Sequence, residues 1–236
     1  MTRKLLTAAA VVAAPLLWPL AASAGVLFTA NGTTICSGPS GMVCIAGTTT
    51  LANGVVISGG SANSNSPGTP AQADLFSSTV TITNPTTATE TVTFFAGDIN
   101  YMHPTAPPGA LLLSSNIGTT TTTGSAVNTM SYISCVDPLN GQNNCTGTLN
   151  TAPVTPIITV SNSNNSQGNN RAITTLASPY SMTEEIQLTL GTGAIINFSA
   201  QTTLVPVPEP ASLTLLGSAL IGLGWLGRRR RRSQTV

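Results

Sequence analysis

The feature that most constrains the fold is a two-residue alternation of apolar and hydroxyl side chains along the middle of the chain. It is clear in LFSSTVTITN (residues 75–84), where one face would carry Phe76, Val80 and Ile82 and the other Thr79, Thr81 and Thr83. Successive side chains of a strand point to opposite faces, so the pattern predicts a strand with one buried face. No sustained helical stripe of apolar residues occurs between residues 25 and 204, which favours an all-β body.

The same alternation returns in segments that follow short turns. ETVTFF (90–95) comes after Asn84-Pro85, and AIINFSAQTTL (194–204) follows EEIQLTL (184–190) and a Gly-Thr-Gly turn. Each pair of segments predicts a β-hairpin. Shorter strands are expected in GVLFTA (25–30) and GVVIS (54–58). The residues expected to face the core are Val92, Phe94, Ile186, Leu188, Leu190, Ile196 and Phe198.

Residues 25–204 have the length of one antiparallel β-sandwich, of the jelly-roll or immunoglobulin-like kind, and no linker divides them. Three polar segments are expected to be solvent-facing loops: SGGSANSNSPGTP (58–70), GTTTTTGS (118–125) and SNSNNSQGNN (161–170).

Charge separates sharply by region. Of the eight basic residues, only Arg171 lies between residues 25 and 208, against six acidic residues, so this part has a formal charge of −5 although the whole chain has +1. A mildly acidic body with one cation cannot coat phosphates, which excludes nucleic acid as a partner.

The first 24 residues are typical of a secretory signal peptide. Arg3 and Lys4 precede an apolar stretch, and the segment closes on the small residues Ala22 and Ala24. The apolar stretch is short for a permanent span, so we expect export through the Sec translocon and cleavage by signal peptidase after Ala24, in preference to an N-terminal anchor.

Four cysteines in an exported chain predict disulfides. Cys36 and Cys44 form one local couple, and Cys135 and Cys145 form another. Four cysteines permit three pairings, and two short loops are the preferred one. A zinc site would need closer spacing and more than the single histidine of this chain.

The C-terminus carries three features in a fixed order. Pro208, Glu209 and Pro210 come first, residues 211–227 contain no ionisable side chain, and five arginines follow as Arg228, Arg229, Arg230, Arg231 and Arg232. As a helix, residues 211–227 would rise about 25 Å, just enough to cross a bilayer. The arginines would then stop transfer on the cytoplasmic side. A plain C-terminal anchor is the alternative.

This order of features resembles the PEP-CTERM sorting signal, here covering residues 205–236. The resemblance implies that a membrane-embedded exosortase recognises the motif residues Pro208, Glu209 and Pro210 and cuts near them. It also implies a Gram-negative bacterium that makes extracellular polysaccharide. It says little about residues 25–204.

No catalytic constellation emerges from the sequence. His103 is the single histidine, with Asp98 its nearest acidic residue, and no Gly-x-Ser-x-Gly motif supplies a nucleophile. Glu184 and Glu185 are adjacent and would point to opposite faces of a strand. Oxygen-rich calcium ligands could come from Asp98 and Asn100, or from Asp137 and Asn140, but neither set has EF-hand order. We therefore expect no metal and no cofactor.

The sequence thus predicts a non-enzymatic surface or extracellular-matrix protein. It would be held briefly in the inner membrane, processed by an exosortase, and associated with exopolysaccharide or a biofilm. A carbohydrate-binding module or adhesin is the first alternative. A hydrolase of unfamiliar type, with His103 as its one sharply defined candidate residue, is the second.

Overall fold

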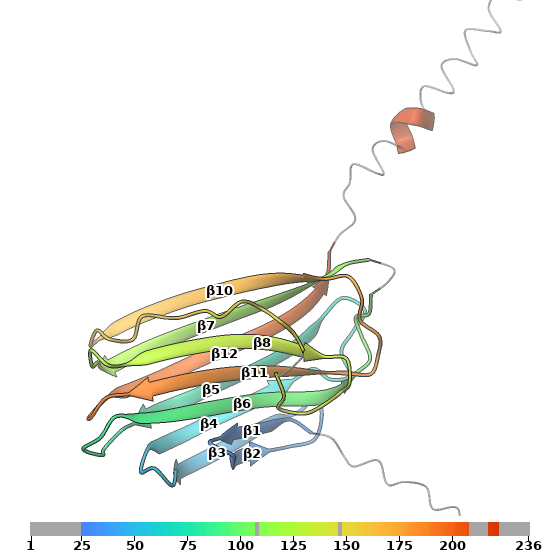
Figure 1. The fold of residues 1–236 in the computed structure, drawn as a ribbon. Helices are drawn as coiled ribbons and strands as arrows, with labels where there is room; N and C mark the ends of the chain where they lie inside the picture. Colours follow the sequence, from blue (N-terminus) through green and yellow to red (C-terminus); the bar gives the residue numbers. More distant parts are fainter. Residues whose placement is uncertain (1–24, 107–108, 146–147, 208–216, 222–236) are drawn as a thin grey trace, which may run out of the picture.

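The computed structural model describes residues 25–106, 109–145, 148–207 and 217–221, except the side chain of Val80. Two antiparallel sheets, each of six strands, pack face to face as a sandwich (Figure 1). The predicted all-β sandwich is confirmed.

The two sheets are defined by their strand order. The first sheet runs in the order β2 (Thr33–Ser37), β1 (Leu27–Ala30), β6 (Glu90–Tyr101), β11 (Tyr180–Leu190), β8 (Thr129–Asp137) and β9 (Leu149–Asn150). The second sheet runs in the order β10 (Ser163–Ile173), β7 (Leu111–Thr123), β12 (Ile195–Pro206), β5 (Ala73–Thr83), β4 (Val56–Ser64) and β3 (Val43–Thr50).

The chain crosses repeatedly between the two sheets. From β5 to β8 each strand lies in the sheet opposite its predecessor, and β10, β11 and β12 alternate in the same way. The order β6-β11-β8-β9 facing β5-β12-β7-β10 is that of a jelly roll. The two predicted hairpins are therefore wrong: β5 and β6 lie in different sheets, and so do β11 and β12.

A buried asparagine holds two of these connections together. The Asn84 side chain donates to the carbonyl oxygens of Ala88, Leu190 and Gly191, at 2.8, 2.9 and 3.2 Å. The backbone N–H of Asn84 donates to Ala194. The turn after β5 is thus joined to the turn after β11, and both chain corners lie together at one end of the sandwich.

The three segments expected to be polar loops are largely strand. Their residues form much of β4, the end of β7 and most of β10. Strand β10 is an edge strand whose eleven residues pair with β7 in one continuous register. Two of its inner side chains bond to β9 and to the segment that follows it, since Arg171 donates to Asn150 at 2.8 Å and Asn169 to Ala152 at 3.3 Å.

The predicted inner face of β5 is only half correct. Ile82 is buried, but Leu75 and Thr79 are also buried, whereas Phe76 lies on the outer face and is half-buried. The register with β12 shifts between Ile196 and Ser199, so β5 holds one extra residue there. Such a β-bulge moves the buried face from odd to even positions.

The apolar side chains between the sheets form one contiguous core. All seven residues expected to face the core are buried there. The Phe94 ring stacks on Phe28 with centroids 5.8 Å apart and meets Phe198 edge to face at 5.2 Å. These rings join β1 and β6 of the first sheet to β12 of the second.

Candidate functional site

The predicted sorting segment begins where the sandwich ends. Strand β12 ends at Pro206, and the N–H of Val207 donates to Ala110 at 2.8 Å. Pro208, Glu209, Pro210 and Arg228 to Arg232 lie outside the described residues, as do Ala22 and Ala24. Residues 217–221, inside the predicted span, are helical. Within the described ranges, no helix is long and apolar enough to cross a membrane.

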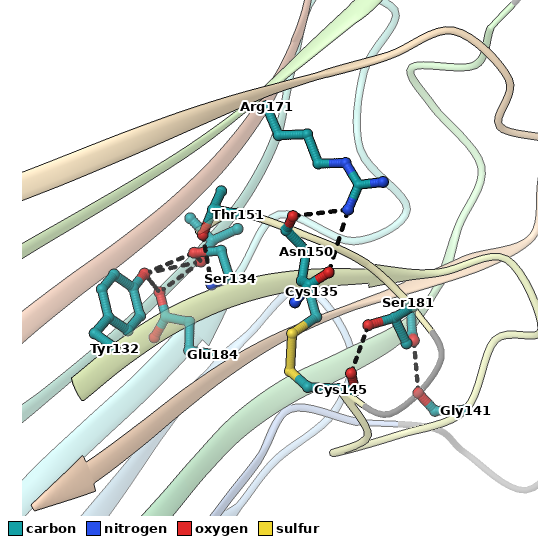
Figure 2. The surroundings of a disulfide bond; sticks show 12 residues. Tyr132, Ser134, Cys135, Gly141, Cys145, Asn150, Thr151, Arg171, Ser181 and Glu184 are labelled. Atoms are coloured by element: carbon teal, nitrogen blue, oxygen red, sulfur yellow. Dashed lines mark hydrogen bonds between the residues drawn. A yellow bond between two sulfur atoms is a disulfide. The ribbon is translucent and has the colours of Figure 1, made fainter. Parts of the chain in front are cut away.

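Two disulfides link the four cysteines in the preferred local pairing. Cys36 on β2 bonds to Cys44 on β3, with Cα atoms 5.7 Å apart, and so connects the edge of the first sheet to the edge of the second. Cys135 on β8 bonds to Cys145 in the following loop, with Cα atoms 5.5 Å apart (Figure 2). Both bonds restrict loops at strand ends.

The pair Glu184 and Glu185 points to opposite faces of β11, as expected. Glu184 is fully buried, and its carboxyl group accepts hydrogen bonds from Thr202 at 3.2 Å and from Ser77. It also accepts from Tyr132 at 3.4 Å (Figure 2). Burial raises the pKa of Glu184 to about 8, against the lowering effect of the hydroxyl donors. Sequence reasoning missed this cluster, because its partners lie on three other strands.

The carboxylates considered as calcium ligands accept hydrogen bonds from donors of the protein itself. Asp98 accepts from the hydroxyl groups of Ser40 and Ser64 and from the N–H groups of Gly41 and Ile99. Among the described residues, no three His, Cys, Asp or Glu side chains gather where they could hold a metal ion.

The two asparagines of the calcium hypothesis do meet. Asn140 donates from its side chain to Asn100 at 2.8 Å, and the N–H of Asn100 donates back to Asn140 at 2.8 Å. The Asp137 carboxylate takes no part in this contact and accepts hydrogen bonds from the N–H groups of Leu139 and Gly141. The hydrogen bonds between Asn100 and Asn140 join the end of β6 to the loop after β8.

His103 lies on the surface, at one end of the sandwich. Its backbone carbonyl accepts from the Tyr180 hydroxyl at 2.7 Å, and its N–H donates to Pro67. Asp98, the expected acidic partner, is buried in its own set of donors. The structure therefore does not bring these two side chains together as a catalytic pair.

The outer face of the second sheet carries a shallow groove of about 550 Å³. Its outward-facing lining on β10, β7 and β12 includes Asn164, Ser166, Thr120, Asn197 and Ser199. A second hollow of about 390 Å³, over β7 and β10, shares Ser166 with it. No motif in the sequence indicates this groove, because its residues come from separate strands.

Strand register shows how the groove is built. Ser166 pairs with Gly118, Gly118 with Ser199, and Ser199 with Ser78, so a row of short side chains crosses the strands. A row of longer side chains flanks it on each side. One row contains Asn164, Thr120 and Asn197, and the other contains Asn116, Gln201, Phe76 and Asn63.

The molecule is thus a disulfide-bonded β-sandwich followed by a C-terminal sorting segment. Residues 206–232 match the family described as the PEP-CTERM protein-sorting motif. The chain therefore carries a PEP-CTERM signal, which indicates export and processing at the cell envelope and implies an exosortase as the processing partner. No curated protein matches the chain.

Several solved structures are similar in part. One is TmCBM61 in complex with β-1,4-galactotriose, with 8% identity, a TM-score of 0.33, and coverage of 62% of this chain and 87% of that one. The enzymatically active domain of tailspike protein 4 from bacteriophage CBA120 shows 11% identity and a TM-score of 0.31, with 77% and 19% covered. Carbohydrate-binding modules of the β-sandwich superfamily show 12% identity and a TM-score of 0.25, with 75% and 82% covered. Likenesses at this level carry no argument about function.

Proposed function

We propose that this chain is a non-enzymatic surface or extracellular-matrix protein of a Gram-negative bacterium, released from the inner membrane by an exosortase. Sec exports it, and signal peptidase removes residues 1–24. Residues 211–227 hold the chain in the membrane with Arg228 to Arg232 on the cytoplasmic side. The sandwich folds outside, where oxidation forms both disulfides.

One observation carries the proposal: the matched sorting motif starts at the last residue of β12. The match covers residues 206–232, and β12 ends at Pro206. A proline at position 210 disfavours helical geometry at Glu209, so the sequence predicts an accessible backbone at the motif, between sandwich and span. A processing enzyme needs such an accessible strip of backbone. Because Val207 still bonds to Ala110, the cut is expected after Val207.

A structural role for the body is supported by the state of its candidate catalytic and metal-binding groups. Asp98 and Asp137 are held by hydroxyl and N–H donors, and Glu184 lies in the core. The surface instead offers uncharged hydroxyl and amide groups around the groove. Such a surface suits association with exopolysaccharide better than chemistry on it.

The sorting proposal is tested by changing the motif in cells that contain the exosortase. Glu209→Ala should leave the chain in the membrane fraction, whereas unchanged protein should reach the exterior. Glu90→Ala on β6 is the matched control, since it removes a carboxyl group of the folded body and should not alter sorting. Equal release of the Glu209→Ala and Glu90→Ala chains would refute the proposal.

A further inference from the structure

We propose that the groove on the outer face of the second sheet binds a neutral polysaccharide chain lying across the strands. The inference rests on the proposed function, because only an exported protein meets such a polymer. It adds to that function a binding site, a ligand class and a direction of binding.

The shape of the groove fits an extended polymer. The groove is lined by residues of β10, β7, β12 and β5, and the row of short side chains that forms its floor continues in register to Ser61 on β4. Neighbouring strands lie about 4.8 Å apart, so this row is about 19 Å long from β10 to β4. Side chains two residues apart on one face are separated by about 6.7 Å, so the flanking rows stand about 13 Å apart. The floor reaches the edge strand β10, so the groove is open there and a longer chain can run past the sheet.

The side chains around the groove offer unused hydrogen-bonding capacity. Those of Asn164, Thr120, Asn197 and Ser199 make no hydrogen bond to another described residue. Amides supply both donors and acceptors, and hydroxyl groups do the same, which matches the many hydroxyl groups of a sugar chain. Phe76, half-buried in the second flanking row, offers a ring on which the apolar face of a pyranose can pack.

The ionisable groups around the groove indicate which class of polymer it can bind. Among the described side chains on the outer face of β4, β5, β12, β7 and β10, Asp74 is the one ionisable group. Gln72 and Gln201 both donate to its carboxyl group, at 2.6 and 3.2 Å. No cation is present there to attract a uronate or sulfate, and the body has a formal charge of −5. The site therefore favours a neutral chain over an acidic one.

Gly118 provides a clean way to block the groove. A Cβ atom placed on Gly118 would meet only the carbonyl oxygen of Ser199, at 3.9 Å. Its neighbours Ile117 and Thr119 point into the core, so a side chain at Gly118 points outward. Valine suits a strand position and would fill the floor without touching the core. Thr122→Val is the matched control, since it adds the same side chain to the outer face of β7 beyond the flanking row.

The test is isothermal titration of the full-length chain, in a detergent without a sugar headgroup, with unbranched hexasaccharides. The neutral probes are β-1,4-glucan, β-1,3-glucan, β-1,4-galactan and β-1,4-mannan, and the acidic probe is oligogalacturonate. We expect at least one neutral probe to bind and the acidic one not to. Gly118→Val should weaken that binding by about tenfold or more, and Phe76→Ala should weaken it too, whereas Thr122→Val should change it by less than about twofold.

Three results would overturn the inference. The first is that no neutral probe binds with a dissociation constant below about 5 mM. The second is that Gly118→Val leaves the binding intact, and the third is that the acidic probe binds as well as the neutral ones. Thermal unfolding of each variant checks that the fold is retained. The sorting proposal is measured separately by cell fractionation, so either proposal can fail while the other stands.

Discussion

Ser77 on β5 donates a hydrogen bond across the sandwich to the carboxyl group of Glu184 on β11. Among the described residues no cation balances this carboxyl group: Arg171, the one Lys or Arg of the body, donates to Asn150 instead. Full burial disfavours the ionised carboxylate more strongly than the hydroxyl donors favour it, so the pKa of Glu184 rises to about 8.

Stability should therefore fall as the pH rises. The pKa of Glu184 is about 8 in the folded chain and 4.5 for the free side chain. Between these values the unfolded chain has lost a proton that the folded chain keeps. The contribution of Glu184 is complete below pH 4.5, and the free energy of unfolding then decreases by up to about 1.4 kcal/mol per pH unit. Urea unfolding of the exported form at several pH values between 5 and 8 measures this slope.

Two variants isolate the source of the slope. Glu184→Gln keeps the shape and hydrogen-bonding capacity of the side chain but cannot ionise, so it should flatten the pH dependence. Glu185→Gln, on the opposite face of β11, should leave most of the slope in place. An unaltered slope in Glu184→Gln would show that other groups cause it.

The disulfide between Cys36 and Cys44 should stabilise the edge of the sandwich at which it links β2 of the first sheet to β3 of the second. It closes a loop of sequence separation 8, and the second disulfide one of 10. Loops of this length stabilise by about 2–3 kcal/mol each, through restriction of the unfolded chain. The Cys36→Ser/Cys44→Ser chain should lose that amount in chemical denaturation. A reducing agent should destabilise this variant about half as much as the unchanged protein, and no effect of the reductant on the unchanged protein would contradict the account.

Asn84 should be among the polar residues most sensitive to substitution. Asn84→Ala leaves the buried carbonyl groups of Leu190 and Gly191 without their side-chain donor, so we expect a loss of about 2–4 kcal/mol in the free energy of unfolding. Asn63→Ala, on the outer face of β4, is the matched control and should change stability by less than about 0.5 kcal/mol. Equal effects of the two substitutions would show that the corner does not depend on Asn84.

The alternation of side chains predicted strands but could not say which sheet each one joins. Ile186, Leu188 and Leu190 face the core as expected, because period-two patterning depends only on the strand itself. Whether the next strand pairs or crosses depends on contacts far along the chain, such as Asn84 to Gly191, which are 107 residues apart. In the sequence, a strand, a turn and a second strand therefore look like a hairpin whether the second strand pairs with the first or crosses to the other sheet.

For β10 in particular, polar composition led to the wrong prediction of a loop. Its inward side chains are Asn, Gln, Ser and Arg, which elsewhere indicate a loop. Arg171 and Asn169 are tolerated inside the edge of the sandwich because the backbone carbonyl groups of Asn150 and Ala152 accept from them. The groove escaped prediction for a related reason, since Gly118 and Ser199 become neighbours only through the register of β7 with β12.

The most direct test of the account is the intact mass of the protein recovered from outside the cells. We predict a chain that begins at Gly25, ends at or near Pro208, Glu209 and Pro210, and lacks Arg228 to Arg232. Its mass should also be lower by four hydrogens, for two disulfides. Recovery of an exterior form that retains the five arginines would contradict processing at the sorting motif.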